Sequence, residues 1–340
     1  MNAAIYELIG AAEFVIDAEG QKKAVMLDFS AWEDLLNLLE DIEDSAEIES
    51  IRAGGEKPVP WEKAKTDLSE KTAQENLQIY RLAREYLLSF DGTSEEMLDA
   101  HLTEWRTRKP GNIRGLFRAM IEHAQNRQGR PNSIGNIDRL GELLFDFDPH
   151  LVAKKYEGWK DIFDAIARSA YRPSGRFDKT NAKSIWVQYC KSILSCAKFL
   201  ADFRDLDEFD RFIEGFYANE HSRIELPFLI EKKVFGFGFP LACDFLKGVG
   251  YPEFIKTDVH IIEIARGVGI STGKRDVDIF RDVIKFCRSI DKLPYEVDKL
   301  FWLIGSGKFY LYNKKVRSSR EEFIRRVRYE LPRFANDIQE

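Results

Sequence analysis

From about Glu70 onward, apolar residues recur at three- and four-residue spacing almost without interruption. The clearest runs cover 74–90, 94–105, 112–124, 134–145 and 181–201. Such spacing places apolar side chains on one face of an α-helix. Breaks rich in Asp, Asn, Gly and Pro separate the runs, with the clearest loops at 171–177 and 128–135, and no strand-type alternation follows residue 30. The sequence therefore predicts an all-α body, and a length of 340 residues leaves room for a second domain.

The N-terminal segment, 1–68, has a different pattern. Residues 12–28 indicate two short strands around a Glu-Gly turn. Ser30 is expected to cap a following helix, with Glu33 at the capping-box position. A second acidic helical stretch follows, and then Gly54-Gly55. We therefore expect a mainly α protein with a small α/β segment at its N terminus.

Charge is divided unevenly between these parts. Segment 1–68 holds 16 Asp/Glu and 6 Lys/Arg, a net charge of −10, whereas segment 69–340 holds 41 Asp/Glu and 45 Lys/Arg, a net charge of +4. Local fields rather than the total charge steer a polyanion to its site. The overall charge of −6 therefore does not exclude a nucleic-acid-binding body.

Composition also bears on the compartment. No run of about eighteen apolar residues occurs, and the N terminus lacks the basic start of a signal peptide. Four cysteines are too few for a disulfide framework. A cytoplasmic protein without a membrane partner is expected.

The stretch 234–260 carries the most specific motif. Helices are expected over 228–234 and 239–247, joined by a tight turn with the sequence Phe235-Gly-Phe-Gly238. Glycine accepts positive φ and lets another backbone approach closely, and the free N–H groups at a helix start can bind phosphate. Pro240 would lie in the first turn of the second helix, where its missing N–H costs little. Taken alone, the motif could equally be a plain helix–helix corner, because short glycine motifs are weak evidence.

A second block strengthens the motif. Asp258, in Thr-Asp-Val-His, follows Pro240 by eighteen positions, and the segment 298–307 reads Asp-Lys-Leu-Phe-Trp-Leu-Ile-Gly-Ser-Gly. Together these blocks resemble the helix-hairpin-helix DNA glycosylase superfamily that includes endonuclease III, over about residues 131–340. The resemblance implies that Gly236, Phe237, Gly238 and Phe239 form a DNA-binding hairpin.

The same resemblance implies that Asp258 is the catalytic carboxylate. Breaking an N-glycosidic bond builds positive charge on the sugar, which an ionised carboxylate can stabilise while it orients a water. The nucleotide must first leave the duplex stack. A helix N-cap is a serious rival role for Asp258, and both roles are compatible because a helix N terminus favours negative charge. His260, two positions on, is expected to be structural support.

Two features depart from the family pattern. Bifunctional members use a lysine amine where this chain has Pro240, so the resemblance implies a monofunctional enzyme that leaves an abasic site. Lys256 is expected to contact phosphate or solvent rather than to replace that amine. The cysteines of the family's iron–sulfur loop are absent from residues 308–333, which instead hold nine Lys/Arg against three Glu. Since the five histidines show no ligand spacing either, neither a metal nor a cofactor is expected.

Further candidates lie in the helical connector, residues 69–130, and beyond it. Residues 105–130 carry seven Lys/Arg and one Glu, and this stretch predicts contacts to DNA phosphates. The contacts are assigned to Arg106, Arg108, Lys109 and Arg114. Trp186 and Tyr189 could stack on a flipped base, although aromatic residues at that spacing are more often core.

Segment 1–68 resembles short antitoxins of the Phd/YefM and RelB kind, through the strand-turn-strand-helix pattern and the closing Pro60-Trp-Glu-Lys-Ala-Lys. The resemblance implies a toxin-like or self partner. Two alternatives stay open, namely that the acidic segment competes with DNA for the basic body, or that it only dimerises.

The expected function is excision of a modified or damaged base from double-stranded DNA. The two resemblances together suggest that the DNA is foreign. One alternative is a catalytically silent helix-hairpin-helix DNA-binding protein. The other is a toxin–antitoxin-type regulatory or interaction protein. Fold alone does not decide among them.

Overall fold

The computed structural model describes residues 12–53, 59–126, 134–171, 173, 177–217 and 219–331. The chain divides into two compact units, Met1–Leu68 and Ser69–Glu340. The described residues are mainly helical, with two small antiparallel strand pairs. The expected fold class, a mainly α protein with a small α/β N-terminal segment, is confirmed.

The described part of the N-terminal unit begins with a hairpin and a helix. Strands β1 (Glu13–Ile16) and β2 (Lys22–Met26) pair antiparallel, and α2 (Phe29–Ala53) follows as one continuous helix. The prediction of Ser30 as the cap was wrong, because the Asp28 carboxylate accepts both the Ala31 N–H and the Ser30 hydroxyl at 2.8 Å. The second acidic stretch is the C-terminal part of α2 rather than a separate helix, and the Gly54-Gly55 break lies outside the described residues.

The second unit begins with helices that the apolar spacing predicted. They are α3 (Trp61–Leu88), which starts within the first unit and thirteen residues before the predicted run 74–90, then α4 (Glu95–Thr103) and α5 (Ile113–Ala124). The end of the predicted run 94–105 forms the 3₁₀ turn η1 (Glu104–Thr107). Asn112 caps α5 by accepting the Gly115 N–H at 2.9 Å. The loop predicted at 128–135 lies mostly outside the described residues.

The helix expected over 134–145 does not form. Only a 3₁₀ turn, η3 (Ile137–Leu140), occurs there, followed by turns. Phe145, Asp146 and Phe147 have φ values of 53°, 52° and 59°, and residues in this left-handed region cannot continue a right-handed helix. Asp148 then caps α6 (Pro149–Lys155), and α7 (Trp159–Arg168) and α8 (Ile185–Leu200) follow.

The C-terminal half is a further series of helices. These are α9 (Leu206–Glu214), α10 (Glu220–Lys233), α11 (Phe239–Gly248), α12 (Val259–Gly267), α13 (Asp276–Ser289), α14 (Pro294–Ser306) and α15 (Arg320–Glu330). A short hairpin, β3 (Lys308–Phe309), η4 (Tyr310–Tyr312) and β4 (Lys314–Lys315), separates α14 from α15. The prediction of no strand after residue 30 missed this pair, because two-residue strands are too short to show alternation.

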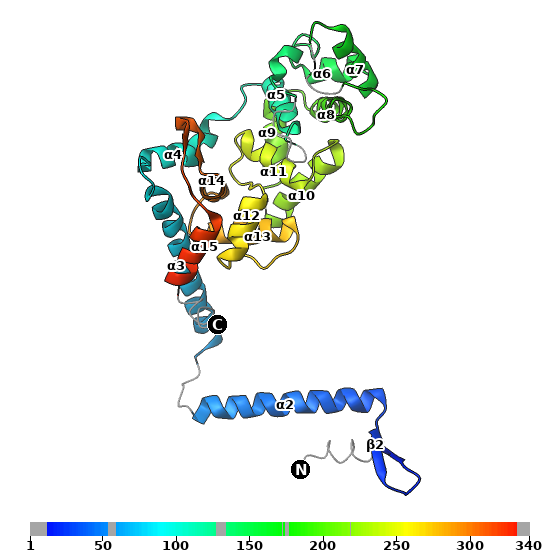
Figure 1. Cartoon of the computed structure of the whole chain (residues 1–340), viewed down its shortest axis with the longest axis vertical. Coiled ribbons are helices and arrows are strands. Elements are labelled where there is room, and N and C mark those ends of the chain that lie inside the picture. Colours follow the sequence, from blue (N-terminus) through cyan, green and yellow to red (C-terminus); the bar gives the residue numbers. More distant parts are fainter. Residues whose placement is uncertain are drawn as a thin grey trace. The chain divides into compact units, whose positions relative to one another are not determined.

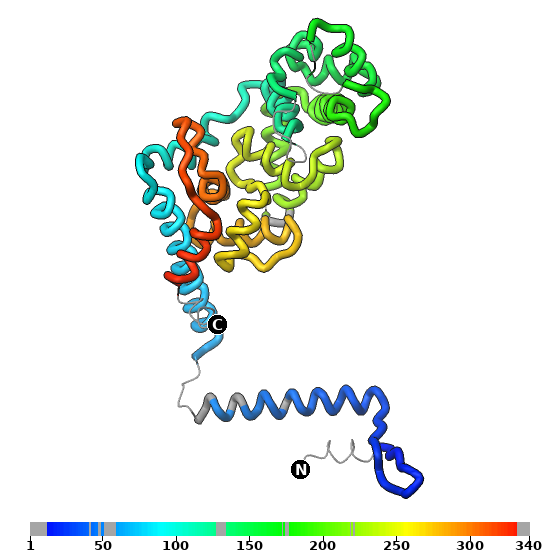
Figure 2. The backbone as a smooth tube through the Cα atoms, viewed as in Figure 1, coloured from blue at the N-terminus to red at the C-terminus, as the bar shows by residue number. Residues whose placement is uncertain are grey.

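Within the second unit, α8 packs against α5, α6 and α7 at one end, and α14 packs against α4, α12, α13 and α15 at the other (Figure 1). Helix α11 contacts α5 and so joins the two groups. The segment β3–η4 after α14 runs beside α4 although the two lie far apart in the sequence (Figure 2). One apolar core cluster runs through the unit. None of the described helices is long and apolar enough to cross a membrane.

Candidate functional site

The Gly-x-Gly turn joins α10 to α11 as the sequence predicted. Gly236 has a φ of 89°, a conformation that only glycine adopts without strain. Gly238 differs from the expectation, because it is the N-cap of α11 with an extended backbone (φ −98°, ψ 171°), and Pro240 lies in the first turn. The N–H groups of Gly238 and Phe239 have no hydrogen-bond partner among the described residues. Two donors at a helix start are therefore available to an anion.

Phe237 of the turn and Phe239 at the start of α11 face the protein interior, whereas Phe235 is exposed. Phe237 and Phe239 are buried, Phe237 against Phe245 and Phe239 against Phe228 and Phe280. The predicted DNA contacts of Phe237 and Phe239 can therefore come only from their backbone. The alternation of Gly and Phe places small residues in the turn while the rings anchor it to the core.

Gly238 offers a test of the hairpin as a DNA-binding element. A Cβ atom there would meet only Pro240 Cδ, at 3.9 Å, so internal packing does not require glycine. Gly238→Ala is expected to change the free energy of unfolding by less than about 1 kcal/mol, yet to weaken duplex binding about tenfold by blocking close approach of a phosphate. Fluorescence anisotropy at low salt measures the affinity.

Gly158 provides the matched control for this experiment. It is also an extended helix N-cap, at α7, and a Cβ there would meet nothing closer than Asp161 Oδ2 at 3.9 Å. Gly158→Ala should leave DNA affinity unchanged. Equal effects of the two substitutions would show that the α10–α11 turn is an ordinary helix corner.

Asp258 lies at the N terminus of α12. Its Oδ1 accepts the N–H groups of His260 at 3.0 Å and Ile261 at 3.3 Å, so the residue is the helix N-cap. Its Oδ2 has no hydrogen-bond partner among the described residues, and the side chain is half-buried. One oxygen therefore fixes the carboxylate while the other stays available to a substrate or a water.

A buried charge network adjoins Asp258. Asp298 on α14, only 1% exposed, pairs with Lys247 on α11 and accepts the Lys256 N–H at 2.6 Å. Lys256 Nζ donates to Asp244 at 3.0 Å, and the Asp258 N–H donates to the Lys256 carbonyl at 2.8 Å. Burial opposes the charge of Lys247, but Asp298 and Asp244 hold its pKa above the usual value. The network thus fixes the backbone segment that leads into Asp258.

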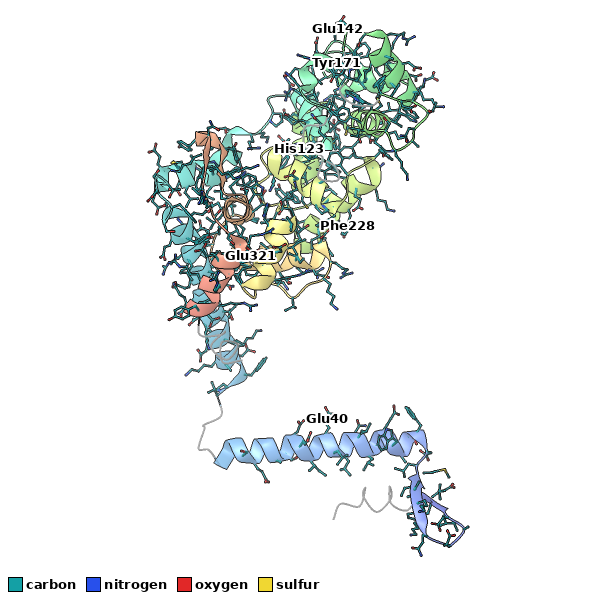
Figure 3. All side chains as sticks on the ribbon, in the orientation of Figure 1. Glu40, His123, Glu142, Tyr171, Phe228 and Glu321 are labelled. Atoms are coloured by element: carbon teal, nitrogen blue, oxygen red, sulfur yellow. The ribbon has the colours of Figure 1, made fainter. Side chains whose placement is uncertain are left out.

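The network forms one wall of a cavity of about 250 Å³. The lining residues are Arg108, His123, Asp244, Lys247, Gly248, Lys256, Tyr295, Lys299, Trp302 and Tyr310. His123, which Figure 3 labels on α5, closes the cavity beside Gly248, where a Cβ would collide with the imidazole. The cavity therefore combines cationic groups with three aromatic side chains, a combination suited to a small planar ligand with hydrogen-bond acceptors.

Lys299 is the least usual of the lining groups. Its side chain is 11% exposed, and burial, followed by the charges of Lys247 and Arg108, lowers its pKa to about 8. A lysine with a strongly lowered pKa in a cavity is typical of functional sites.

The basic residues predicted to contact DNA lie in different surroundings. Lys109 pairs with Asp210 at 2.8 Å, and Arg114 pairs with Asp148 at 2.9 Å. Arg106 lies over the Trp105 ring at 5.6 Å. Arg108 pairs with Glu104 and lines the cavity rather than an open surface. Their contacts to DNA stay predictions, and the part of the stretch from 127 to 130 lies outside the described residues.

Trp186 and Tyr189, the weaker base-stacking candidates, belong to the core. They are 1% and 3% exposed, and neither lines the cavity. Trp186 packs edge-on against Tyr171 and Phe177, and the Tyr189 hydroxyl donates to the Ile121 carbonyl at 3.1 Å. The aromatic groups at the cavity are Tyr295, Trp302 and Tyr310 instead.

His260 is held by contacts to neighbouring side chains and backbone. The His260 ring lies against Gly305, where a Cβ would collide with it, and Arg320 donates to its Nδ1 at 3.3 Å. Burial lowers the pKa of His260 despite the neighbouring Asp258. Among the described residues, no group of three or more His, Cys, Asp or Glu side chains is arranged to hold a metal ion.

Several cavity residues escaped the sequence analysis. Tyr295, Lys299 and Trp302 follow one another at four- and three-residue spacing on α14 and share one helix face. Asp298 and Lys299 also belong to the segment 298–307 on which the family resemblance rests. That spacing was the available signal, but nothing in it shows that Arg108 and Lys247 would join the same cavity.

Comparison with known proteins gives one structural similarity. No protein-family model matches the chain, and no curated protein matches it at a significant level. The solved structure of Tm1821, the 8-oxoguanine DNA glycosylase of Thermotoga maritima, is similar at a TM-score of 0.39 and 13% sequence identity, over 71% of this chain and 99% of that chain. A similarity of this size establishes neither a shared activity nor a shared substrate.

Proposed function

We infer that this protein is a monofunctional DNA glycosylase that excises a modified or damaged base from duplex DNA. The observation that carries the inference is the half-buried Asp258 carboxylate, with one oxygen free of protein partners among the described residues, adjoining the buried charge network that walls the cavity. The α10–α11 turn supports the inference, because two N–H groups without a partner in the described part of the chain suit a DNA phosphate.

The reaction requires little of the protein beyond placement and charge. The target nucleotide leaves the stack and its base enters the cavity. As the C1′–N bond breaks, positive charge develops on the sugar, where the Asp258 carboxylate stabilises it. Water adds its oxygen to C1′, and its proton passes to the leaving base nitrogen, directly or through Asp258. The products are a free base and an abasic site.

Strand cleavage is not expected from the hairpin. Pro240 has no amine with which to form a Schiff base, and Lys256 donates to Asp244. Lys247 has a raised pKa and pairs with Asp298, so its amine is protonated and held. Lys299, with a pKa of about 8, is mostly protonated at neutral pH and donates to the Tyr310 hydroxyl, so the abasic strand should stay intact until alkali cleaves it.

A panel assay tests the proposal. The purified chain is incubated with duplexes that each carry one modified base, and alkali then cleaves any abasic site. Breaks at the modified position that disappear in Asp258→Asn support the glycosylase. Binding without breaks across the panel would instead favour a silent DNA-binding protein, and absence of binding at low salt would favour an interaction scaffold.

The acidic N-terminal unit is proposed to restrain DNA binding by the body. Its helix α2 carries exposed carboxylates at Glu33, Asp34, Glu40, Glu43, Asp44 and Glu49. Changing these six to Gln or Asn in the full chain should raise duplex affinity several-fold at low salt and have no effect at high salt. Unchanged affinity at low salt would leave a toxin-like or self partner, or simple dimerisation, as the role of the unit.

Helix α2 also has an exposed apolar face, which would be the contact surface if the unit dimerises or binds a partner. Trp32, Leu36, Leu39 and Ile42 are about half exposed and lie at helical spacing. Sedimentation of the full chain measures whether this face joins two copies. The antitoxin resemblance of the N-terminal unit, joined to a glycosylase body, would suit an enzyme directed against foreign DNA.

A further inference from the structure

Lys299 lies in an aromatic enclosure at the cavity. Its Nζ is 5.4 Å from the Tyr295 ring centroid, 5.5 Å from that of Trp302 and 4.9 Å from that of Tyr310. The rings stabilise the ammonium through cation–π attraction and exclude water from it. The small exposed part of the side chain faces the cavity, because Lys299 is one of its lining residues.

Hydrogen bonding leaves part of this ammonium unused. Nζ donates to the Tyr310 hydroxyl at 2.7 Å, while the distance to Glu104 Oε2 is 3.8 Å, too long for a hydrogen bond. Since an ammonium has three N–H groups, two of them have no partner among the described residues. Glu104 has little capacity left to serve them, because its carboxylate already accepts from Tyr310, Arg108 and Tyr295.

Arg108 lies beside Lys299. Its Nη2 donates to Glu104 and, at 3.3 Å, to the Tyr310 hydroxyl, which also accepts from Lys299. Buried donors without acceptors are costly, so a guest that supplies an acceptor gains affinity, and one that presents another N–H does not. The four cationic side chains that line the cavity outnumber its one carboxylate, Asp244, and this also disfavours a positively charged guest.

We propose that Lys299 is a specificity-determining residue, which selects a flipped base bearing a carbonyl oxygen over the same base bearing an amino group. The inference rests on the proposed function, since it assumes that the cavity receives a base. It narrows the substrate class to keto bases, whether purine or pyrimidine. At neutral pH the lowered pKa of Lys299 still leaves most of the amine protonated and able to donate.

Two matched pairs of bases test the proposal by binding. Duplexes carry hypoxanthine or adenine, and uracil or cytosine, each opposite a tetrahydrofuran residue so that no base is paired. Within each pair a carbonyl replaces an amino group at one ring position, and the adjacent ring nitrogen changes from an acceptor to an N–H donor. Affinities are measured with Asp258→Asn, so that no base is released during the experiment. With Lys299 unchanged, the Asp258→Asn protein should bind the keto member of at least one pair about tenfold or more tightly than the amino member.

Lys299→Met in the same background should reduce that preference to less than about threefold, while affinity for an undamaged duplex stays unchanged. Lys299→Gln, which keeps a neutral donor, should retain an intermediate preference and guards against a folding defect in the methionine variant. Lys285 is an exposed lysine on α13, and Lys285→Met is the control. It should change neither the keto preference nor the affinity for an undamaged duplex.

Equal affinity for the keto and amino members of both pairs would overturn the proposal, and so would a preference that survives in both Lys299 variants. The proposed function is tested separately, because it concerns release of the base. If the protein releases no base but still shows a keto preference that depends on Lys299, the specificity proposal holds and the proposed glycosylase activity is contradicted.

Discussion

Asp258→Asn is expected to reduce base release by at least about 100-fold while changing the free energy of unfolding by less than about 0.5 kcal/mol. Asparagine caps a helix about as well as aspartate, so the bonds from the His260 and Ile261 N–H groups should persist. Only the negative charge is lost, together with its stabilisation of the developing sugar cation. Single-turnover excision and urea unfolding measure the two quantities.

The substitution separates the two roles that Asp258 could have. Asp258→Ala serves as the comparison, because it loses the cap as well and should cost about 1 kcal/mol of stability. Asp205, the N-cap of α9, provides a control of the same kind, and Asp205→Asn should retain full excision. If Asp258→Asn excises bases at the rate of the unchanged protein, Asp258 is only a helix cap.

Lys247→Met is expected to destabilise the protein by about 3–5 kcal/mol. Lys247 and Asp298 form a pair whose side chains are 11% and 2% exposed, and removing the lysine leaves the Asp298 carboxylate buried without its counter-ion. The Lys256 N–H, which donates to Asp298 at 2.6 Å, compensates only in part. Urea unfolding, with the slope checked for a change, measures the loss.

Two further results should accompany this loss. Burial of an unpaired carboxylate raises its folded pKa, so the folded variant binds more protons than the unfolded chain, and its stability should fall further as pH rises. Adding Asp298→Asn should recover part of the loss, because the uncompensated charge is removed. Lys256→Met removes a more exposed partner of Asp244 and should cost about 1 kcal/mol or less. Equal losses for the two lysines would contradict the buried pair.

Apolar periodicity and motif spacing predicted many of the helices, and they predicted the turn and the helix start that carry Gly236, Gly238 and Asp258. Helix α11, the turn before it and the start of α12 at Asp258 lie where the sequence placed them, whereas α10 begins at Glu220, eight residues before the expected start. Local rules succeeded there because each feature depends on nearby residues, such as a glycine at positive φ or a proline in a first helical turn.

The errors have physical causes of two kinds. The run 134–145 had helical spacing, but three consecutive left-handed residues from Phe145 to Phe147 turn the chain instead. Ser30 looked like a cap, yet Asp28 accepts the N–H that a cap must satisfy. Backbone conformation decided the first outcome and the side-chain hydrogen bond of Asp28 decided the second, and apolar spacing reports neither.

The cavity could not be predicted because its walls come from distant segments. Arg108 precedes α5, Lys247 lies in the last turn of α11, Lys299 lies on α14 and Tyr310 belongs to η4. Arg108 was expected to contact phosphate because it lies in a basic stretch, and only tertiary packing places it beside Lys299. The same packing buries Trp186 and Tyr189, which sequence spacing alone could not distinguish from pocket residues.

Stoichiometric release of a free base tests the central claim most directly. The full chain, in excess over duplexes bearing single modified bases, is followed by mass spectrometry of the released base and by gel analysis before and after alkali. For at least one keto base in the panel, we expect one free base for each alkali-labile site. The strands should be intact before alkali, and Asp258→Asn should release no base. Binding of every duplex with no free base detected, or strand cleavage before alkali, would contradict a monofunctional glycosylase.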